Sequence, residues 1–146
     1  MGTVVSIHRV SEKDGAAQAL SEANYIANFG LEGDWRSRKG RGRQITLVEA
    51  ESLEKVAKTL KMKQVPDGAS RRQVVVRGIS LNDTVGKRLK VGPLLIEVHD
   101  LCDPCSNMES KIGRGAMKAM DGIGGICAKV IEGGVLRPGD AVSVLD

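Results

Sequence analysis

Short apolar runs separated by turn residues make up most of this chain. Apolar and polar positions alternate over residues 3–10, which is typical of a half-buried strand. Strands this short and this closely spaced favour a barrel over a doubly wound parallel sheet. Further strands are predicted over residues 44–48, 74–76, 87–91, 94–98, 125–131 and 141–145.

One segment has the spacing of a helix instead. Its apolar positions recur on one helical face, which predicts an amphipathic helix that ends at about residue 62. Thr46 and Glu49 have the spacing of a capping box, so we expect the helix to begin within a turn of them. The apolar stripe consists of Leu53, Val56, Ala57 and Leu60.

The remaining segments are expected to be loops and turns. Residues 30–42 are rich in glycine and arginine, and loops of that length are usually functional or disordered. A turn is expected at residues 66–68. Because glycine interrupts residues 107–120, they allow at most a short helix around residues 116–120. We therefore expect one domain, mainly β, with one clear helix and short helical segments.

Composition excludes several classes of function. The net charge is +4, but all three aromatic residues lie between Tyr25 and Trp35, so the chain has no stacking ladder for single-stranded nucleic acid. We expect neither a nucleic-acid partner nor a membrane span, because no apolar run approaches about 18 residues. An odd cysteine count and an N-terminus without signal-peptide character favour a reducing cytoplasm.

Two of the three cysteines stand close together after an apolar run. Pro104 restricts the backbone before Cys105, which predicts a thiol held in one place at the end of a strand. Such a thiol can be a soft metal ligand, a nucleophile or a redox partner. Cys102 and Cys105 could also form half of a zinc site completed by His99 and Cys127, or simply be core thiols. Cys127 itself is expected in the core of a strand.

Arginine residues gather in two clusters on either side of the predicted helix. Arginine binds phosphate and carboxylate through a planar fork. Together with Cys105, the clusters predict a pocket for an anionic ligand whose reactive end meets sulfur, with a solvated basic surface as the alternative. The first cluster is Arg36, Arg38, Lys39, Arg41 and Arg43, and the second is Arg71, Arg72 and Arg77.

The sequence resembles a known family, the MOSC domain, named after the C-terminal domain of molybdenum cofactor sulfurases. Similar blocks occur in family order from about residue 4 to residue 145, so the resemblance covers nearly the whole chain. The blocks are Gly33-Asp34-Trp35-Arg36, residues 44–49, residues 70–82, Asp103-Pro104-Cys105, residues 124–128 and Gly139-Asp140.

The resemblance implies a β-barrel-like fold that binds molybdenum cofactor, an anionic pterin. Cys105 would then be the catalytic residue and the metal ligand, because a thiolate suits a molybdenum already bound by dithiolene sulfur. Arg71 and Arg72 would contact the cofactor phosphate, with Arg36 and a helix N-terminus near Thr46 as additional contacts.

Two departures from the family pattern bear on this site. Many members carry Asn at the position of Gln73, so the polar contact there is expected to be longer or absent. Asp103 places a carboxylate beside the Cys105 thiol, which opposes ligation by a thiolate unless arginine offsets the charge.

Three functions remain open on the sequence. The chain could be a reductase of N-hydroxylated compounds supplied by separate electron-transfer proteins. It could instead carry the cofactor, or persulfide sulfur on Cys105 received from a sulfur-donor protein. It could also be a module that binds zinc, or one that binds an anionic ligand other than the cofactor. Larger relatives attach an aminotransferase-like domain, and this chain has no visible lysine site for pyridoxal phosphate.

Overall fold

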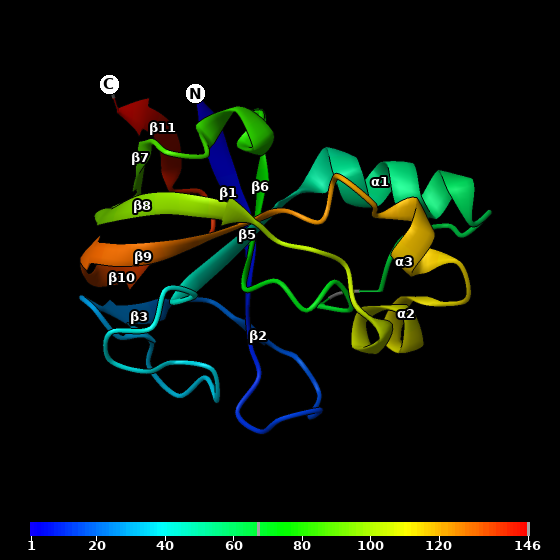
Figure 1. The fold of residues 1–146 in the computed structure, drawn as a ribbon, viewed down its shortest axis with the longest axis horizontal. Coiled ribbons are helices and arrows are strands. Elements are labelled where there is room, and N and C mark those ends of the chain that lie inside the picture. The colour runs from blue at the N-terminus through cyan, green and yellow to red at the C-terminus, as the bar shows by residue number, and fades with distance from the viewer. Residues whose placement is uncertain (67, 146) are drawn as a thin grey trace.

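The computed structural model describes residues 1–66 and 68–145, and the strands of this part dominate the fold. Seven of them form a closed barrel, which confirms the prediction of a mainly β, barrel-like fold. The barrel strands are β1 (Gly2–Arg9), β5 (Ile45–Glu49), β6 (Val74–Arg77), β7 (Arg88–Val91), β8 (Leu94–Leu101), β9 (Ile126–Glu132) and β11 (Ala141–Leu145). Their order around the barrel is β11-β7-β8-β9-β5-β6-β1, and pairing of β1 with β11 closes it (Figure 1).

Four shorter strands lie outside the barrel wall in the described part of the chain. β2 (Gln18–Leu20) pairs with the end of β1. A small sheet has the order β10-β3-β4 and consists of β3 (Ala23–Ile26), β4 (Gly30–Leu31) and β10 (Gly134–Leu136). The sequence pattern did not predict these short strands, because two to four residues are too few to show a period.

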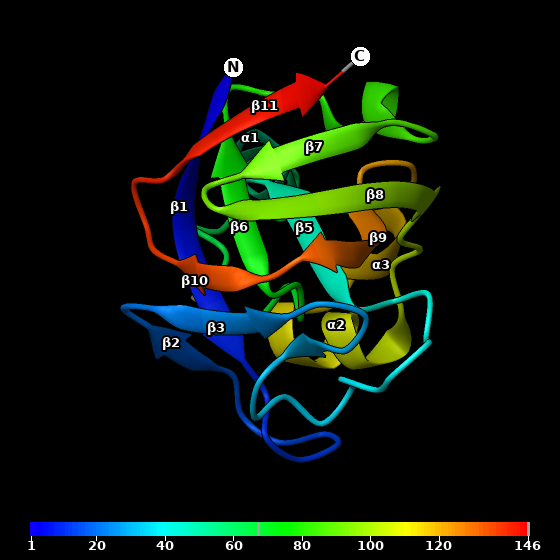
Figure 2. The same cartoon turned by 90° about the vertical axis from the view of Figure 1, so that its left-hand side faces the viewer.

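The helices gather on one side of the barrel. They are α1 (Ala50–Thr59), α2 (Ser106–Ile112) and α3 (Ala116–Ala119), with a 3-10 turn, η1, at Leu81–Thr84. Figure 1 shows the three α-helices together beyond the barrel, and in Figure 2 they lie behind its strands. In the described part of the chain, no helix has the length and hydropathy needed to cross a membrane.

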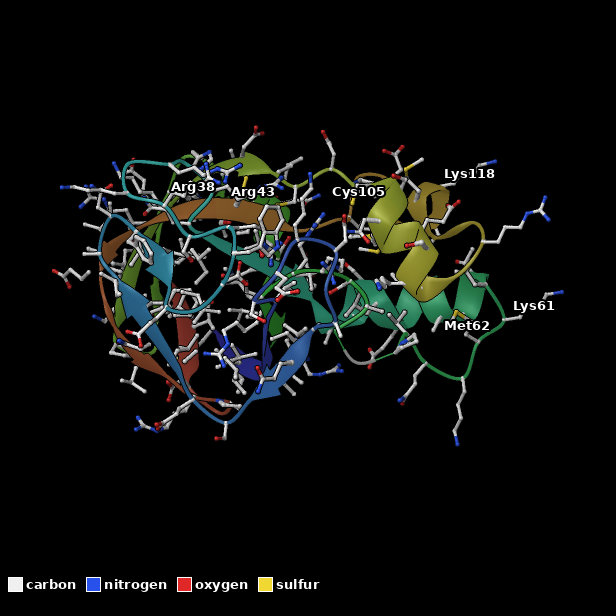
Figure 3. The ribbon with its side chains drawn as sticks, turned by 90° about the horizontal axis from the view of Figure 1, so that it is seen from below. Arg38, Arg43, Lys61, Met62, Cys105 and Lys118 are labelled. Carbon is white, nitrogen blue, oxygen red and sulfur yellow. The ribbon has the colours of Figure 1, made fainter. Side chains whose placement is uncertain are left out.

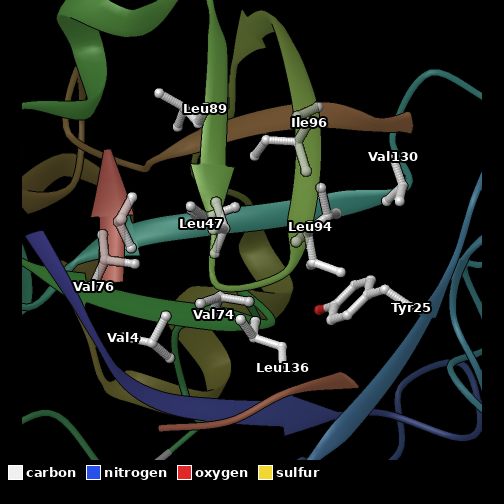
Figure 4. Close-up of a cluster of buried hydrophobic side chains, with 14 of the residues drawn as sticks. Val4, Tyr25, Leu47, Val74, Val76, Leu89, Leu94, Ile96, Val130 and Leu136 are labelled. Carbon is white, nitrogen blue, oxygen red and sulfur yellow. The ribbon is translucent and has the colours of Figure 1, made fainter. Parts of the chain in front are cut away.

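The barrel interior is filled by aliphatic side chains from every strand of its wall. Val4, Leu47, Val74 and Ile96 are each at most 1% exposed (Figure 4). Tyr25 is the one aromatic member of this cluster, and it enters from β3. Because alternate residues of each strand point inwards, the barrel is a packed core rather than a pore.

Strands β5 and β6 are buried on both faces, which explains why their sequences do not alternate. Leu47 and Val74 point into the barrel, whereas Val48 and Val75 contact the helices on the outside. The two strands are parallel and α1 connects them, so they form a βαβ unit inside an otherwise antiparallel barrel. Parallel strands covered on both sides typically appear as continuous apolar runs.

A second core lies between the three helices and this outer face. Val56 of α1 packs with Met108 and Ile112 of α2 and with Ala116 of α3. All four side chains are at most 5% exposed. The short helices therefore depend on packing against the barrel wall, since isolated helices of this length are marginal in water.

Several predicted boundaries need correction. Helix α1 begins at Ala50 and ends at Thr59, and no side-chain cap bond is formed at Glu49, so the expected capping box was wrong. Thr46 lies in β5 instead. Strand β8 continues to Leu101, and helix α2 was missed. The turn expected at residues 66–68 includes residue 67, which lies outside the described residues.

Gly125 is the glycine that the barrel packing requires most clearly. Its φ of +98° lies in the region that side chains other than glycine rarely adopt. A Cβ atom there would also overlap the carbonyl oxygen of Leu47. The start of β9 can therefore approach β5 only if residue 125 lacks a side chain.

We predict that Gly125→Ala destabilises the protein by more than about 2 kcal/mol, because strain and backbone overlap add. Gly139→Ala is the matched control, since Gly139 has a φ of +96° and no atom within 4 Å of an added Cβ. It should cost only the conformational part, about 1 kcal/mol. Urea unfolding of the two variants measures the difference, and equal losses would contradict the packing argument.

Candidate functional site

Cys105 lies where the barrel meets the helices (Figure 3). Its thiol side chain is exposed, and the residue is the N-cap of α2, with an extended backbone at φ −136° and ψ 167°. The N–H of Glu109 donates to the Cys105 carbonyl at 3.1 Å. The sequence predicted a thiol presented at a strand end, whereas the structure places it at the start of a helix that follows the strand.

Arg72 holds the turn that precedes Cys105. The side chain is buried, with the residue only 3% exposed. Its Nε donates to the carbonyl of Gly124 at 2.6 Å, and its Nη2 donates to the carbonyl of Asp103 at 2.9 Å. Burial lowers the pKa of Arg72, with the Cys102 thiol opposing this effect, but arginine stays charged in proteins. One guanidinium therefore ties the Cys105 turn to the segment that enters β9.

Arg71 has an unusual backbone. Its φ is +63°, in the left-handed region, although the residue is buried. Its Nη1 donates to the carbonyl of Gly15 at 2.6 Å, and its own carbonyl accepts from Nη1 of Arg36 at 2.9 Å. Burial, followed by the charge of Arg36, lowers the pKa of Arg71. Strained non-glycine residues cost about 1–3 kcal/mol and cluster at functional sites.

Arg36 is in turn held by a buried carboxylate. Asp34 accepts from Nε of Arg36 at 3.2 Å, and the Asp34 side chain is fully buried in this ion pair. The other Asp34 oxygen accepts from the backbone N–H of Val10 at 3.1 Å. The Gly33-Asp34-Trp35-Arg36 block is thus a brace between the first strand and the left-handed turn at Arg71.

Thr46 and Gln73 are both buried. The backbone N–H of Gln73 donates to Oγ1 of Thr46 at 2.9 Å, and the Gln73 side-chain oxygen accepts from the hydroxyl of Tyr25 at 2.9 Å. Burial is the main reason why the pKa of Tyr25 is raised. Thr46 lies in β5 and helix α1 begins only at Ala50, so the helix N-terminus expected at Thr46 was wrong, whereas the contact of Thr46 with a cofactor stays a prediction.

Two other cysteines form a pair that sequence reasoning missed. Cys102 and Cys127 are both buried, and the Cys127 thiol donates to the carbonyl of Asp100 at 3.8 Å. The neighbouring Cys102 thiol, and after it the guanidinium of Arg43, lowers the pKa of Cys127 despite its burial. The Cys127 thiol, together with burial, raises the pKa of Cys102. Desolvation alone would lower the pKa of Arg43, but the cysteine charges outweigh it and raise it.

The arginines and Cys105 share one electrostatic environment. A charge on Cys105 acts on Arg43, Arg71 and Arg72, and Arg36 acts on Arg71 and Arg72. Arg77 belongs elsewhere, because it pairs with Glu54 on the surface at 2.6 Å. The structure therefore brings together Cys105 and residues from both predicted clusters, as an accessible thiol amid surplus positive charge.

A cavity of about 710 Å³ lies away from this thiol, between α1, β1 and β6. Its walls include Leu53, Ala57, Met62 and Val75, with Lys58 at the side. Neither Cys105 nor the arginines around it belong to the lining. Among the described residues, no three histidine, cysteine or acidic side chains are grouped as a metal site, so the alternative zinc site has no donor cluster there.

Comparison with known proteins shows which family and which solved structures this chain is similar to. The model of the MOSC domain family matches residues 34–143. The structure is similar to the YuaD protein from Bacillus subtilis, with a TM-score of 0.82 and 18% identity over 99% of this chain and 96% of that one. It is also similar to YiiM from Geobacillus stearothermophilus (TM-score 0.78, 18% identity, 100% and 76% covered) and from Escherichia coli (0.72, 17%, 99% and 70%). No curated protein matches the sequence significantly.

We predict that Arg72→Met lowers the free energy of unfolding by about 2–4 kcal/mol, because two buried carbonyls lose a charged donor. Amide hydrogen exchange around residues 103–105 and 124 should also become faster. Arg77→Met is the control, as its exposed ion pair with Glu54 should contribute little. If the two variants were equally stable, Arg72 would not hold the turn that precedes Cys105.

Proposed function

Because the chain belongs to the MOSC domain family, we propose that it binds molybdenum cofactor with Cys105 as the protein ligand of molybdenum. The observation that carries this proposal is the exposed Cys105 thiol amid the charges of Arg43, Arg71 and Arg72. A soft donor beside cationic groups matches a ligand that combines a sulfur-bound metal with a phosphate.

The thiol fits this role because of how it is held. Cys105 is fixed between Pro104 and the first turn of α2, and Arg72 binds the carbonyl of Asp103, two residues before Cys105. A ligand held in place loses little conformational freedom on binding.

The arginines suit phosphate binding because the hydrogen bonds of the described residues do not use all of their side-chain N–H donors. In the hydrogen bonds of the described residues, the Arg71 side chain donates only through Nη1, and the Arg72 side chain only through Nε and Nη2. A guanidinium has five N–H donors, so each can still bind an anion. Arg36 would act indirectly, by holding the carbonyl of Arg71. Gln73 and Asp103 remain proposed cofactor contacts, although the Gln73 side chain is bonded to Tyr25.

When bound, molybdenum cofactor supplies two-electron redox chemistry. Cys105 would orient the metal and the arginines would retain the phosphate, which suits a reductase of N-hydroxylated compounds that stays loaded through many turnovers. Such an enzyme needs a separate electron-transfer protein as partner. The free state of all three cysteines suits a reducing cytoplasm, and we assign the whole chain to a single domain.

One observation favours a second function, that of a carrier. Cys105 is exposed and lies outside the large cavity, so a partner protein could reach it directly. A carrier would deliver the cofactor, or persulfide sulfur on Cys105, to an acceptor protein.

We predict that protein made in cells able to synthesise molybdenum cofactor contains molybdenum and pterin in equal amounts. Cys105→Ser should lower bound molybdenum at least about ten-fold while the far-ultraviolet circular dichroism is unchanged, because an exposed ligand contributes little packing. Cys102→Ser is the matched control and should keep the metal. Elemental analysis with fluorescence of the oxidised pterin gives both measurements. Absence of both components after gentle purification and reconstitution would overturn the proposal.

We predict that loaded protein, given a chemical electron donor, reduces N-hydroxylated bases or amidoximes through many turnovers and keeps its molybdenum. The carrier function predicts the opposite: no turnover, and transfer of cofactor or labelled sulfur to an apo-enzyme. Product analysis and the molybdenum content of each protein after the assay separate the two. The Cys105→Ser variant, treated in the same way, controls for reaction with free cofactor.

A further inference from the structure

The cavity beside α1 has the size of a small-molecule site. Its volume of about 710 Å³ falls within the range of about 300–1,000 Å³ that is typical of such sites. The described residues of its lining come from α1, β1, β6 and the segment between α1 and β6. Leu53, Met62 and Val65 pack against the second core and also line the cavity, so much of its wall is aliphatic.

One wall of the cavity is shaped by a β-bulge in β1. The pairing of β1 with β6 shifts register between Val4 and Ser6, so Val5 is an extra residue on β1. A bulge turns a side chain away from the regular alternation of its strand. Val5 lines the cavity and is 45% exposed, whereas Val4 and Ile7 are buried inside the barrel. The bulge therefore leaves an aliphatic side chain open to this space.

Two lysine side chains give the cavity a positive charge. Lys58 and Lys63 belong to the lining, and neither forms an ion pair with any described residue. Glu54 lines the cavity too, but its carboxylate is already paired with Arg77 at 2.6 Å. An anion bound beside the two lysines would therefore gain their charge without displacing one of these ion pairs.

The residue types of the lining favour one kind of anion. None of its described residues is an arginine or an aromatic residue. Phosphate is commonly bound by the planar fork of arginine, and flat rings commonly stack on aromatic side chains. Aliphatic walls beside lysine suit an alkyl chain with a single negative charge, because burial of methylene groups is favourable and lysine acts as a point charge.

We propose that this cavity binds an alkyl carboxylate of medium length, with its chain along the aliphatic wall and its carboxylate at Lys58 and Lys63. The site is separate from the cofactor site proposed above, because neither Cys105 nor the arginines around it line the cavity. Figure 3 shows Met62 near the C-terminal end of α1, well away from Cys105. Binding of the carboxylate therefore does not require the cofactor.

The test titrates the full chain, without cofactor, with sodium octanoate below the concentration at which it forms micelles. Calorimetry should show one saturable site, and amide NMR shifts should change at residues 5–8 and 53–65 but not at residues 103–109. Octanol lacks the charge and butyrate lacks most of the chain, so both should bind at least about five-fold more weakly. Equal binding of octanoate and octanol, no saturable binding, or shifts confined to other residues would overturn the proposal.

Lysine variants test where the carboxylate lies. The double variant Lys58→Gln, Lys63→Gln should bind octanoate at least about five-fold more weakly and octanol as before, because only the charge is lost. Lys55→Gln is the matched control, since Lys55 is an exposed residue of α1 outside the lining, and it should change neither affinity. An unchanged octanoate affinity in the double variant would contradict the proposal.

A change at the bulge tests where the chain lies. Val5→Asp should remove measurable octanoate binding, because it places a second carboxylate on the aliphatic wall. Val144→Asp is the matched control, as Val144 is a strand valine of similar exposure, 40%, outside the lining. Circular dichroism should show that both variants are folded. Equal octanoate affinities in the two variants would overturn the proposal, whatever the molybdenum content of the protein.

Discussion

The Cys105 end of the barrel depends on the buried guanidinium of Arg72. Its bonds to the carbonyls of Asp103 and Gly124 join the two segments that lie just beyond the β8–β9 ladder, which ends at the pair Leu101–Ile126. A buried charge is tolerated only where its donors are satisfied, so these two segments must stay close to it. Arg72 lies just ahead of β6, whose position in the barrel wall is fixed by pairing with β5 and β1. The wall therefore sets the position of the thiol through one side chain.

The same wall separates two environments. Strands β5 and β6 turn one face to the barrel interior and the other to the helices, so a shift of either strand would disturb both cores. Residues 71 and 72 directly precede β6, so the position of this strand limits how far they can move. Cys105 and α2 attach to the second core, through Met108 and Ile112. The cofactor site proposed above lies at the boundary of the two, between rigid strands and short helices.

Sequence patterns predicted the strands that appear either as alternating segments or as continuous apolar runs. The valine run at residues 74–76 and the alternating segment that became β1 both appear as strands. The spacing of Thr46 and Glu49 led to the wrong prediction of a capping box, because the same spacing also occurs by chance in a strand that leads into a helix. Helix α2 was missed because Gly113 and Gly115 suggested a loop, although both lie beyond its end.

Only the residue types of the site were predictable. Cys105 and the two arginine clusters were visible in the sequence, whereas the backbone carbonyls that accept from Arg36, Arg71 and Arg72 carry no sequence signal. The approach of Cys127 to Cys102 depends on the register of two strands, and short apolar strands do not specify register in their sequence.

Arg71 shows where this protein departs from its most stable form. A left-handed residue is accommodated best by glycine, and next by asparagine. Arg71 nevertheless donates from its guanidinium to the carbonyl of Gly15, and its own carbonyl accepts from Arg36. A glycine at this turn would therefore relieve the backbone strain, but it would give up both the bond to Gly15 and a cation whose charge acts on Cys105.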